Sequence, residues 1–577
     1  MQVHRTRAMR GLVAALWACT ACPGDSGDTT GTDTDATGGA TEPGPTGTAP
    51  TGTVTDDPTP TSSTTSEPPD TTDGPTSNVT DDPVPTTDTD PTDSTTATDT
   101  TDATTDTTTG GQAAHVVVHL VPQAGVNGFQ RVNFAVPLAP GVLADDTQIA
   151  VVQAGTELGT ALRGLARHPD GSWRSVQIQV ELEIDGETDL DVYLNAAPNA
   201  GWFEAVPVAD TLVDDDNGPR VWALLPPEWL TASRFAGRLD TEAQAQGTPS
   251  QAWSDKCDYD EWDHEAFLGV MGQADVWLYD RGTLLYRGHA RRGDLSTLRS
   301  AYLETTIYRN GLSGLGPDTT IGVPGKTGDA KYYYTQNMAL HYLLTGDDRF
   351  RESAEDVAEA YDDLWNPGYD GDDGFWTERH AGFGLLAYVW AMNVSDDQAD
   401  QFRGLAEAAV TAYLDVQDSY PPGYDDPDAR CFAHTDVAAD EDFGFWGCSP
   451  WLSAILADGL DQFATDSQGA MADAARASLV KLGRVVARDG LDPDGKPYYW
   501  MGVGDGNGAV DDYDEHWGES AYVVALAYYH DGAADPMLKQ TAESLAEGLG
   551  DLGEVPHMRS FNWQCRSAVA TSWHLAQ

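Results

Sequence analysis

Within residues 113–200, short segments that alternate apolar and polar residues follow one another. Pro-Gly and Asp-Gly turns separate them at intervals of roughly ten to twenty residues, a spacing typical of antiparallel sheets. The segments that carry this pattern are residues 115–121, 132–136, 149–152, 176–180 and 190–194. The pattern predicts a small antiparallel β-barrel or β-sandwich over residues 113–200.

The next segment, residues 201–270, has a weaker pattern. One more strand is predicted over residues 221–225, and the remainder is acidic and aromatic without a clear period. We therefore interpret residues 201–270 as a connecting region.

From residue 271 the hydrophobic period becomes helical, and two kinds of helix alternate. Residues 383–391 and 521–529 are apolar on nearly every side, whereas residues 402–413 are apolar on one side only. Helices that are apolar all round lie inside a fold, and amphipathic helices lie outside. Short polar turns join the two kinds of helix at residues 293–294, 346–347, 396–397, 465–466 and 531–532. The chain therefore reads as a series of inner–outer helical hairpins.

The starts of the inner helices predict how many hairpins there are. These helices are expected to begin near Asp275, Lys331, Arg379, Gly447, Glu515 and Trp563. Six inner helices indicate an (α/α)6-type toroid over residues 271–577, in a multidomain β + α protein. An open helical solenoid is the alternative, although solenoids usually have more regular repeats and polar caps.

The N-terminus has the features of an export signal over residues 1–22. Arg5, Arg7 and Arg10 precede a short apolar run that is too short to span a bilayer. The sequence Leu-Trp-Ala-Cys at residues 16–19 resembles a bacterial lipobox, which predicts lipidation of Cys19. Lipidation of Cys22 and ordinary cleavage are the alternatives. We expect an exported protein, either secreted or held at the outer membrane or cell surface by its lipid.

Residues 23–111 consist almost entirely of threonine, aspartate, proline, glycine, serine and alanine. Such a segment cannot bury enough apolar surface to offset the entropy lost on ordering. The composition predicts a disordered linker between the export signal and the folded part.

The charge of the protein is strongly negative, at −60. The linker holds 18 of the 92 acidic residues and no lysine or arginine, and the export signal holds three of the 32 bases, so 74 acids and 29 bases remain in residues 112–577. A protein with this charge repels nucleic acid at long range, and we expect no nucleic-acid partner.

Four cysteines lie beyond the export signal: Cys257, Cys431, Cys448 and Cys565. In an exported chain they suggest up to two disulfides, for which three connectivities are possible. Cys431 and Cys448 flank one loop and are the expected pair. A zinc site formed with His434 is the alternative, although the spacing fits no standard template.

Two motifs in the strand-rich domain resemble a known family. They are Phe-Ala-Val-Pro-Leu-Ala-Pro-Gly at residues 134–141 and Arg-His-Pro-Asp-Gly-Ser-Trp at residues 167–173. Both resemble the N-terminal barrel domain of the exo-acting rhamnogalacturonan lyases. The resemblance implies an α/α toroid after the β-domains and cleavage of acidic pectic chains by β-elimination. It covers residues 113–200, and the toroid only in general architecture, so the family's catalytic residues are not carried over.

The arrangement of the hairpins indicates where a functional site would lie. Every short turn follows an inner helix, so the long loops lie at the opposite rim, where the inner helices begin. Loops on a rigid scaffold often carry function, and converging helix N-termini favour anions. The long loops of this chain are rich in aromatic and ionisable residues.

Candidate site residues are taken from these loops and from the first turns of the inner helices. The catalytic candidates are Tyr334, Arg379, His380 and His516. The substrate-binding candidates are Trp376, Glu378, His434, Trp446, Trp451, Glu519, Trp563 and Arg566. His380 and His516 are expected to face a common ligand across the mouth of the toroid, with Arg379 and Glu519 beside them. The structural alternative is that the aromatic residues fill the core and each histidine bonds a loop carbonyl.

Three functions fit these residues, and each has a polysaccharide or oligosaccharide as partner. A lyase needs a Tyr or His base and an Arg beside a uronate carboxyl, and we favour this interpretation. A hydrolase needs two carboxylates, available among Glu378, Glu441, Glu515 and Glu519. A non-catalytic glycan-binding lipoprotein is the third. No cofactor is required, although Ca²⁺ is possible at the acidic segments 214–218 and 370–374.

Overall fold

The computed structural model describes residues 114–577, except 323–327, 369–376, 435–443, 505, 512–514 and 553–556. The predictions for the export signal, Cys19, the linker, Trp376, Glu441 and the acidic segment 370–374 concern residues outside this described part. In the described part, no helix is both long and apolar enough to cross a membrane.

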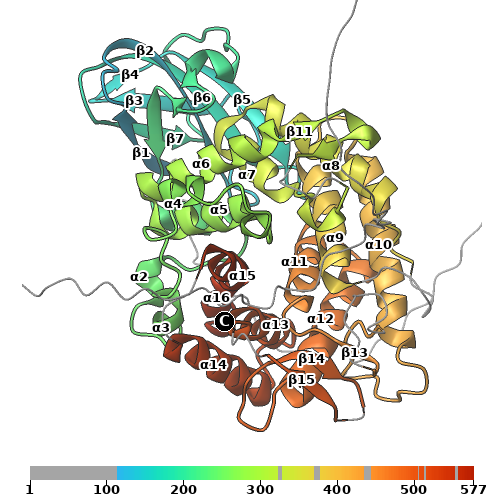
Figure 1. Cartoon of the computed structure of the whole chain (residues 1–577). Helices are drawn as coiled ribbons and strands as arrows, with labels where there is room; N and C mark the ends of the chain where they lie inside the picture. The colour runs from blue at the N-terminus through green and yellow to red at the C-terminus, as the bar shows by residue number, and fades with distance from the viewer. Residues whose placement is uncertain are drawn as a thin grey trace, which may run out of the picture. The chain divides into compact units, whose positions relative to one another are not determined.

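The N-terminal domain is a β-sandwich of two antiparallel sheets (Figure 1). One sheet has the strand order β10-β1-β7-β3-β4 and the other the order β2-β6-β5. The strands are β1 (His115–Pro122), β2 (Gly128–Pro137), β3 (Ile149–Gln153), β4 (Thr156–Glu157), β5 (Thr160–Arg167), β6 (Trp173–Ile184), β7 (Thr188–Leu194) and β10 (Val221–Leu224). Val116, Val118 and Leu120 alternate with more exposed neighbours in β1 and enter the core. The predicted strands are present, and β10 joins the sandwich from the connecting region.

Six inner helices form a closed ring. They are α5 (Arg281–Arg292), α7 (Gln336–Thr345), α9 (Glu378–Val394), α11 (Ser453–Asp466), α13 (Trp517–His530) and α15 (Met558–Ala568). Each contacts the next along the chain, and α15 contacts α5. This last contact closes the toroid and excludes the open solenoid.

The outer helices follow the inner ones after the predicted short turns. They are α6 (Leu295–Asn310), α8 (Asp348–Leu364), α10 (Ala399–Ser419), α12 (Ala470–Asp489) and α14 (Pro536–Asp551), and the short α16 (Thr571–Leu575) follows α15. The inner helix α13 is buried on nearly every side, whereas α10 buries only one side. The hydrophobic pattern therefore predicted correctly which helices lie inside.

Short elements complete the described part. The helices are α1 (Pro227–Ser233), α2 (Glu242–Ala245), α3 (Gln251–Ser254) and α4 (His264–Leu268), and the strands are β8 (Leu212–Asp214), β9 (Gly218–Pro219), β11 (Leu312–Ser313), β12 (Thr320–Ile321), β13 (Gly447–Cys448), β14 (Tyr498–Gly502) and β15 (Gly508–Val510). A 3₁₀ turn at Asp275–Trp277 occupies the predicted start of the first inner helix, so α5 begins only at Arg281.

The sandwich packs on the short-turn end of the toroid. Asn133 Nδ2 donates a hydrogen bond to the Thr345 carbonyl at 2.8 Å, and Ser175 Oγ donates to the Leu343 carbonyl at 2.6 Å. These carbonyls belong to the last turn of α7, where backbone carbonyls have no N–H partner within the helix. Gly346 ends α7 with φ +71°, and a Cβ there would lie 2.4 Å from Gln177. Only glycine allows this close approach of the sandwich.

One inner helix, α11, holds three parts of the chain together through buried aspartates. Asp466 pairs with Arg174 of the sandwich at 2.6 Å. Asp461 pairs with Arg238 of the connecting region at 2.5 Å. Asp458 pairs with Arg287 of α5 at 2.9 Å.

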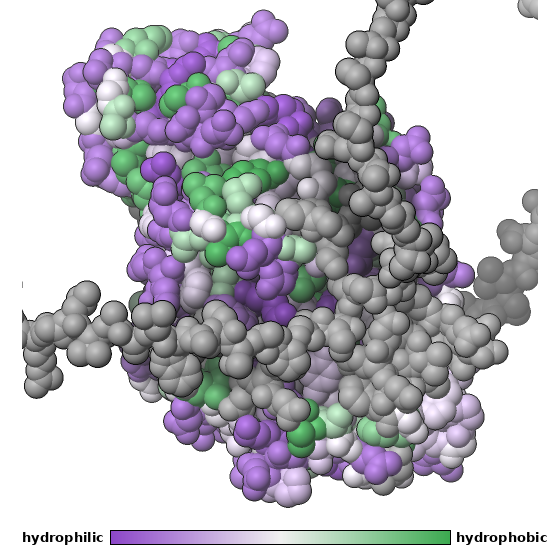
Figure 2. All heavy atoms as spheres, in the orientation of Figure 1, coloured by the Kyte–Doolittle hydropathy of each residue, from purple (hydrophilic) through white to green (hydrophobic). Residues whose placement is uncertain are grey.

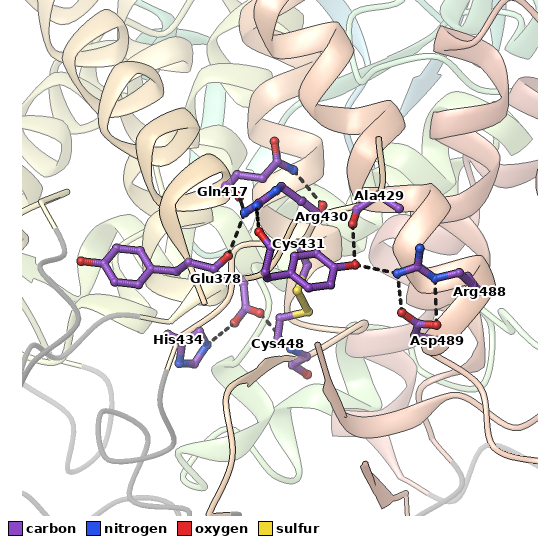
Figure 3. The surroundings of a disulfide bond; sticks show 12 residues. Glu378, Gln417, Ala429, Arg430, Cys431, His434, Cys448, Arg488 and Asp489 are labelled. Atoms are coloured by element: carbon purple, nitrogen blue, oxygen red, sulfur yellow. Dashed lines mark hydrogen bonds and ion pairs between the residues drawn. A yellow bond between two sulfur atoms is a disulfide. The ribbon is translucent and has the colours of Figure 1, made fainter. Parts of the chain in front are cut away.

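Both possible disulfides are present. Cys431 is bonded to Cys448, as predicted, and Cys257 is bonded to Cys565. Because both sulfur atoms of the first pair are joined (Figure 3), they are not free to ligate zinc, and the zinc alternative is wrong.

Removing the Cys257–Cys565 disulfide is expected to destabilise the protein more than removing Cys431–Cys448. The two bonds span 308 and 17 residues, respectively. Loop-closure entropy gives roughly 6 kcal/mol for the long loop and roughly 3 kcal/mol for the short one. Urea unfolding of the two Cys→Ala double variants measures the difference. An equal loss in both variants would contradict the prediction.

Candidate functional site

An aromatic cluster lies where three inner helices and the residues before α5 meet at the long-loop rim. We call Tyr279, Trp451, His516, Glu519 and Trp563 the mouth cluster. Tyr279 precedes α5, Trp451 precedes α11, His516 and Glu519 belong to the start of α13, and Trp563 lies in α15. Segments far apart in the sequence therefore supply one site.

The rings of the mouth cluster pack closely. His516 stacks on Trp451 with 4.2 Å between ring centroids and 4° between planes, and its centroid lies 5.0 Å from that of Trp563. Tyr279 meets Trp563 edge-on at 5.1 Å. All five side chains are buried.

Several buried polar atoms of this cluster lack a hydrogen-bond partner among the described residues. They include both ring nitrogens of His516, both carboxyl oxygens of Glu519 and the indole nitrogens of Trp451 and Trp563. His516 Nδ1 lies 3.9 Å from Glu519 Oε1. Folded proteins satisfy nearly all buried polar groups, so these atoms can accept a ligand or ordered water as partner.

Burial raises the pKa of the Glu519 carboxyl, and the neighbouring His516 opposes this shift. Desolvation disfavours the charged form of a carboxyl group in an apolar environment. The direction of the shift makes Glu519 a better proton donor near neutral pH than an exposed glutamate.

A tyrosine–arginine pair lies at the edge of the cluster. Arg379 Nη1 donates a hydrogen bond to the Tyr279 hydroxyl at 3.1 Å. Burial raises the pKa of Tyr279 to about 12, against the effect of Arg379. Tyr279 and Asp280 have φ values of 70° and 53°, a left-handed conformation that is costly for non-glycine residues and often found at functional sites.

A second cation reaches the cluster from α15. The Arg559 guanidinium lies 4.3 Å from the centre of the Trp563 ring, and the side chain is partly exposed, like that of Arg379. Sequence reasoning missed Tyr279 and Arg559. The predicted helix start at Asp275 placed Tyr279 inside a helix. In the segment that follows Arg559, the sequence gave Trp563 and Arg566 as candidates instead.

His380 has surroundings different from those of His516. Its Nδ1 lies 2.5 Å from the Thr377 hydroxyl, its Nε2 lies 3.9 Å from Asp329, and its ring stacks on Trp365. Burial lowers the pKa of His380 to about 4. Among the described residues no direct contact joins His380 to His516, and their role around a common ligand stays a prediction.

Two other candidates are engaged inside the toroid. The Tyr334 hydroxyl donates to the Trp277 carbonyl at 2.9 Å, and burial raises its pKa well above the ordinary value. Arg566 Nη2 donates to Gln336 at 2.8 Å, and Arg566 Nη1 lies 3.0 Å from Asp458. These contacts suit structural roles.

Glu378 and His434 form a fully buried pair beside the Cys431–Cys448 disulfide (Figure 3). Their carboxyl oxygen and ring nitrogen are 2.9 Å apart, and the other oxygen of Glu378 accepts the Ser449 backbone N–H at 2.8 Å. The pair therefore anchors the loop to the start of α9. Trp446, in the same loop, stacks on Tyr420 at 5.3 Å.

The acidic segment 214–218 uses its carboxylates in protein contacts. Asp214 accepts hydrogen bonds from the backbone and side chain of Asn217, and Asp215 pairs with Arg349 at 3.1 Å. Within the described ranges, no three His, Cys, Asp or Glu residues form a group that could hold a metal ion. The proposed Ca²⁺ role stays a prediction.

Comparison with known proteins gives little further information. No protein-family model matches the sequence, and no curated protein matches it. A solved structure of a polysaccharide lyase is 11% identical, with a TM-score of 0.39 over 56% of this chain and 98% of that chain. A similarity of this size supports no argument about activity. The resemblance to rhamnogalacturonan lyases stays a prediction, and its segment 167–173 forms the turn between β5 and β6.

Lowering the pH from 7 to 4 is expected to destabilise the fold. Burial lowers the pKa values of His289, His380 and His574 to about 4, and it lowers the pKa of His341 well below its ordinary value. The unfolded chain binds these protons below about pH 6.5, so their stabilisation is complete above that pH and falls by up to about 1.4 kcal/mol per pH unit per histidine below it. Urea unfolding at several pH values measures the slope, and a His574→Gln variant should have a shallower one. A flat profile between pH 6.5 and 4.5 would contradict this.

Proposed function

We propose that this chain is a carbohydrate-active enzyme that binds a glycan at the mouth cluster and cleaves a uronate-containing chain by β-elimination. The observation that carries the proposal is the Tyr279–Arg379 hydrogen bond near the buried His516, whose closest charged neighbour among the described residues is Glu519 at 3.9 Å. The proposal includes export of the protein and its anchoring through a lipid on Cys19.

The chemistry of β-elimination needs three kinds of group. A base removes the proton next to the uronate carboxyl, the bond to the leaving oxygen breaks as a carbon–carbon double bond forms, and that oxygen takes up a proton. His516 or Tyr279 is the candidate for each proton transfer. Negative charge builds up on the carboxyl as the first proton leaves, and Arg379 can stabilise it. Trp451 and Trp563 provide apolar faces of the kind on which sugar rings stack.

A second candidate function, glycoside hydrolysis, is favoured by one observation. Glu519 has a raised pKa in an apolar, aromatic environment, which is what a general acid in a glycosidase needs. Asp511 contributes to that shift through its charge and is the candidate for the second carboxylate. The general acid and its partner would then replace Tyr279 and Arg379 as the reacting groups.

One assay separates these functions. The purified protein is incubated with a panel of neutral and uronate-containing glycans, and both ultraviolet absorbance from unsaturated uronates and new reducing ends are measured. Elimination produces both signals, hydrolysis produces reducing ends alone, and a non-catalytic binding protein retains glycan without either. New reducing ends without ultraviolet absorbance would reject the lyase in favour of the hydrolase.

A further inference from the structure

A buried carboxylate joins two of the long-loop segments that supply the mouth. Glu378 begins α9, and its side chain is fully buried. One of its oxygens lies 2.9 Å from His434 Nε2 (Figure 3), and the other accepts the Ser449 backbone N–H at 2.8 Å. Both partners belong to the segment between α10 and α11. Glu378 therefore connects the first turn of α9 to the residues that lead into α11.

The residues next to these contacts belong to the candidate site. Arg379 follows Glu378 directly in α9 and donates a hydrogen bond to the Tyr279 hydroxyl at 3.1 Å. Trp451 lies two residues after Ser449, and its ring centroid is 6.0 Å from that of Tyr279. Arg379 and Trp451 therefore meet at the same tyrosine. Glu378 holds together the two backbone segments from which they come.

The loop side of this connection is itself fixed. His434 exchanges two backbone hydrogen bonds with Gly447, at 2.9 and 3.2 Å. The disulfide between Cys431 and Cys448 joins the residues on either side of this pairing. Because its partners are held in place by other contacts, Glu378 can fix the first turn of α9 against them.

A buried pair of this kind is better explained by geometry than by stability. Replacing a buried ion pair by apolar residues of similar volume is often neutral or stabilising. A carboxylate, however, can accept hydrogen bonds on both oxygens and so fix two partners in defined directions. Such precision matters at an active site, where a misplacement of about 1 Å can lower the rate by about 10²-fold.

We propose that Glu378 is a positioning residue, which sets Arg379 and Trp451 relative to Tyr279 without touching the glycan. In this proposal Glu378 acts through its neighbours and not as a substrate ligand, the role expected from the sequence. The effect on turnover rests on the proposed function. The effect on the geometry of the mouth cluster does not.

Three variants of the full chain test the proposal. Glu378→Gln keeps the size of the side chain and an oxygen for the Ser449 N–H, whereas Glu378→Ala removes both contacts. Glu378→Met with His434→Leu replaces the whole pair by apolar side chains, so it is expected to fold even where Glu378→Ala does not. Asp466→Asn is the matched control, because Asp466 is also a buried carboxylate and pairs with Arg174 at 2.6 Å, at the short-turn end of the toroid.

Two measurements are made on each variant. The first is circular dichroism of the Trp451–Trp563 pair, whose ring centroids are 5.7 Å apart with 30° between planes. Indoles this close share their electronic transitions and give bands of opposite sign, which a Trp451→Phe variant identifies. The second is kcat/KM for a uronate-containing glycan.

The proposal predicts opposite results for the Glu378 variants and the control. Glu378→Ala and the double variant are expected to lose more than about half of the band amplitude and at least about 30-fold in kcat/KM, with an equal fall in kcat. Glu378→Gln is expected to keep kcat/KM within about threefold of the wild type, because it retains the geometry. Asp466→Asn should leave both measurements unchanged.

The outcomes separate this inference from the proposed function. Unchanged bands in the double variant would overturn the positioning role, whatever the activity. An equal loss of kcat/KM in Glu378→Gln and Glu378→Ala would also overturn it, because the charge of Glu378 would then matter and not its geometry. Weakened bands in a chain that turns over no glycan would support the positioning role and reject the enzyme.

Discussion

Replacing Arg379 by alanine is expected to lower kcat/KM for the glycan by a factor on the order of 10³, with the fold intact. The reason is that Arg379 is the partly exposed cation bonded to the Tyr279 hydroxyl. Removing one group that stabilises developing negative charge typically costs a factor of about 10²–10³, and losing the effect of Arg379 on Tyr279 adds to this. Steady-state ultraviolet absorbance measures the loss, and urea unfolding checks that stability changes by less than about 1 kcal/mol.

Two further variants locate the proton transfer. Tyr279→Phe keeps the ring packed against Trp563 but removes the hydroxyl, and His516→Gln keeps a polar group of similar size. If Tyr279 is the base, the first variant should lose at least about 10²-fold in kcat, and if His516 is the base, the second should. Arg488→Ala is the control for loss of a surface charge. Full activity in both Arg379→Ala and Tyr279→Phe would place the chemistry elsewhere.

The architecture could be predicted because it depends on local patterns. The all-round apolar segment 521–529 and the one-sided segment 402–413 identified inner and outer helices. The short turns between them appear where expected, except that α11 continues through residues 465–466 and the turn lies at residues 467–469. Antiparallel strands with one buried side likewise leave an alternating pattern in the sequence. On the face seen in Figure 2, the surface of the sandwich is mostly hydrophilic.

The candidate site could be predicted only in part, because it depends on contacts between distant segments. The starts of the inner helices gave Trp451, His516, Glu519 and Trp563 as candidates, and the structure brings these four residues together. Tyr279 was missed because two successive residues with positive φ interrupt the helical pattern, and nothing in the local sequence requires that. The surroundings of His380 are likewise set by Asp329, more than fifty residues earlier in the chain.

Some of the acidic residues of the chain have a structural role that composition alone does not show. Asp458, Asp461 and Asp466 occupy one helix and each neutralises an arginine from another part of the chain. A count of acidic residues treats these three like the acids of the linker. Burial distinguishes them, since an unpaired charge in the interior costs several kcal/mol and one at the surface costs little.

Replacing Asp458 by asparagine is therefore expected to destabilise the protein by about 3–5 kcal/mol. Asp458 accepts two hydrogen bonds of 2.9 Å from Arg287 and lies 3.0 Å from Arg566 Nη1, and all three side chains are buried. Asparagine keeps the shape but removes the carboxylate that contacts both guanidinium groups, which is the costly way to break a buried ion pair. Urea unfolding measures the loss.

A matched control and a second background make this test specific. Asp473→Asn removes a carboxylate that is 75% exposed and pairs with Arg476 at 2.8 Å, and it is expected to cost less than about 1 kcal/mol. In an Arg566→Met background one buried cation is already gone, so Asp458→Asn should cost less than it does in the wild type, with a coupling of about 1 kcal/mol or more. Equal costs in both backgrounds would contradict this coupling and show that the destabilisation does not depend on Arg566.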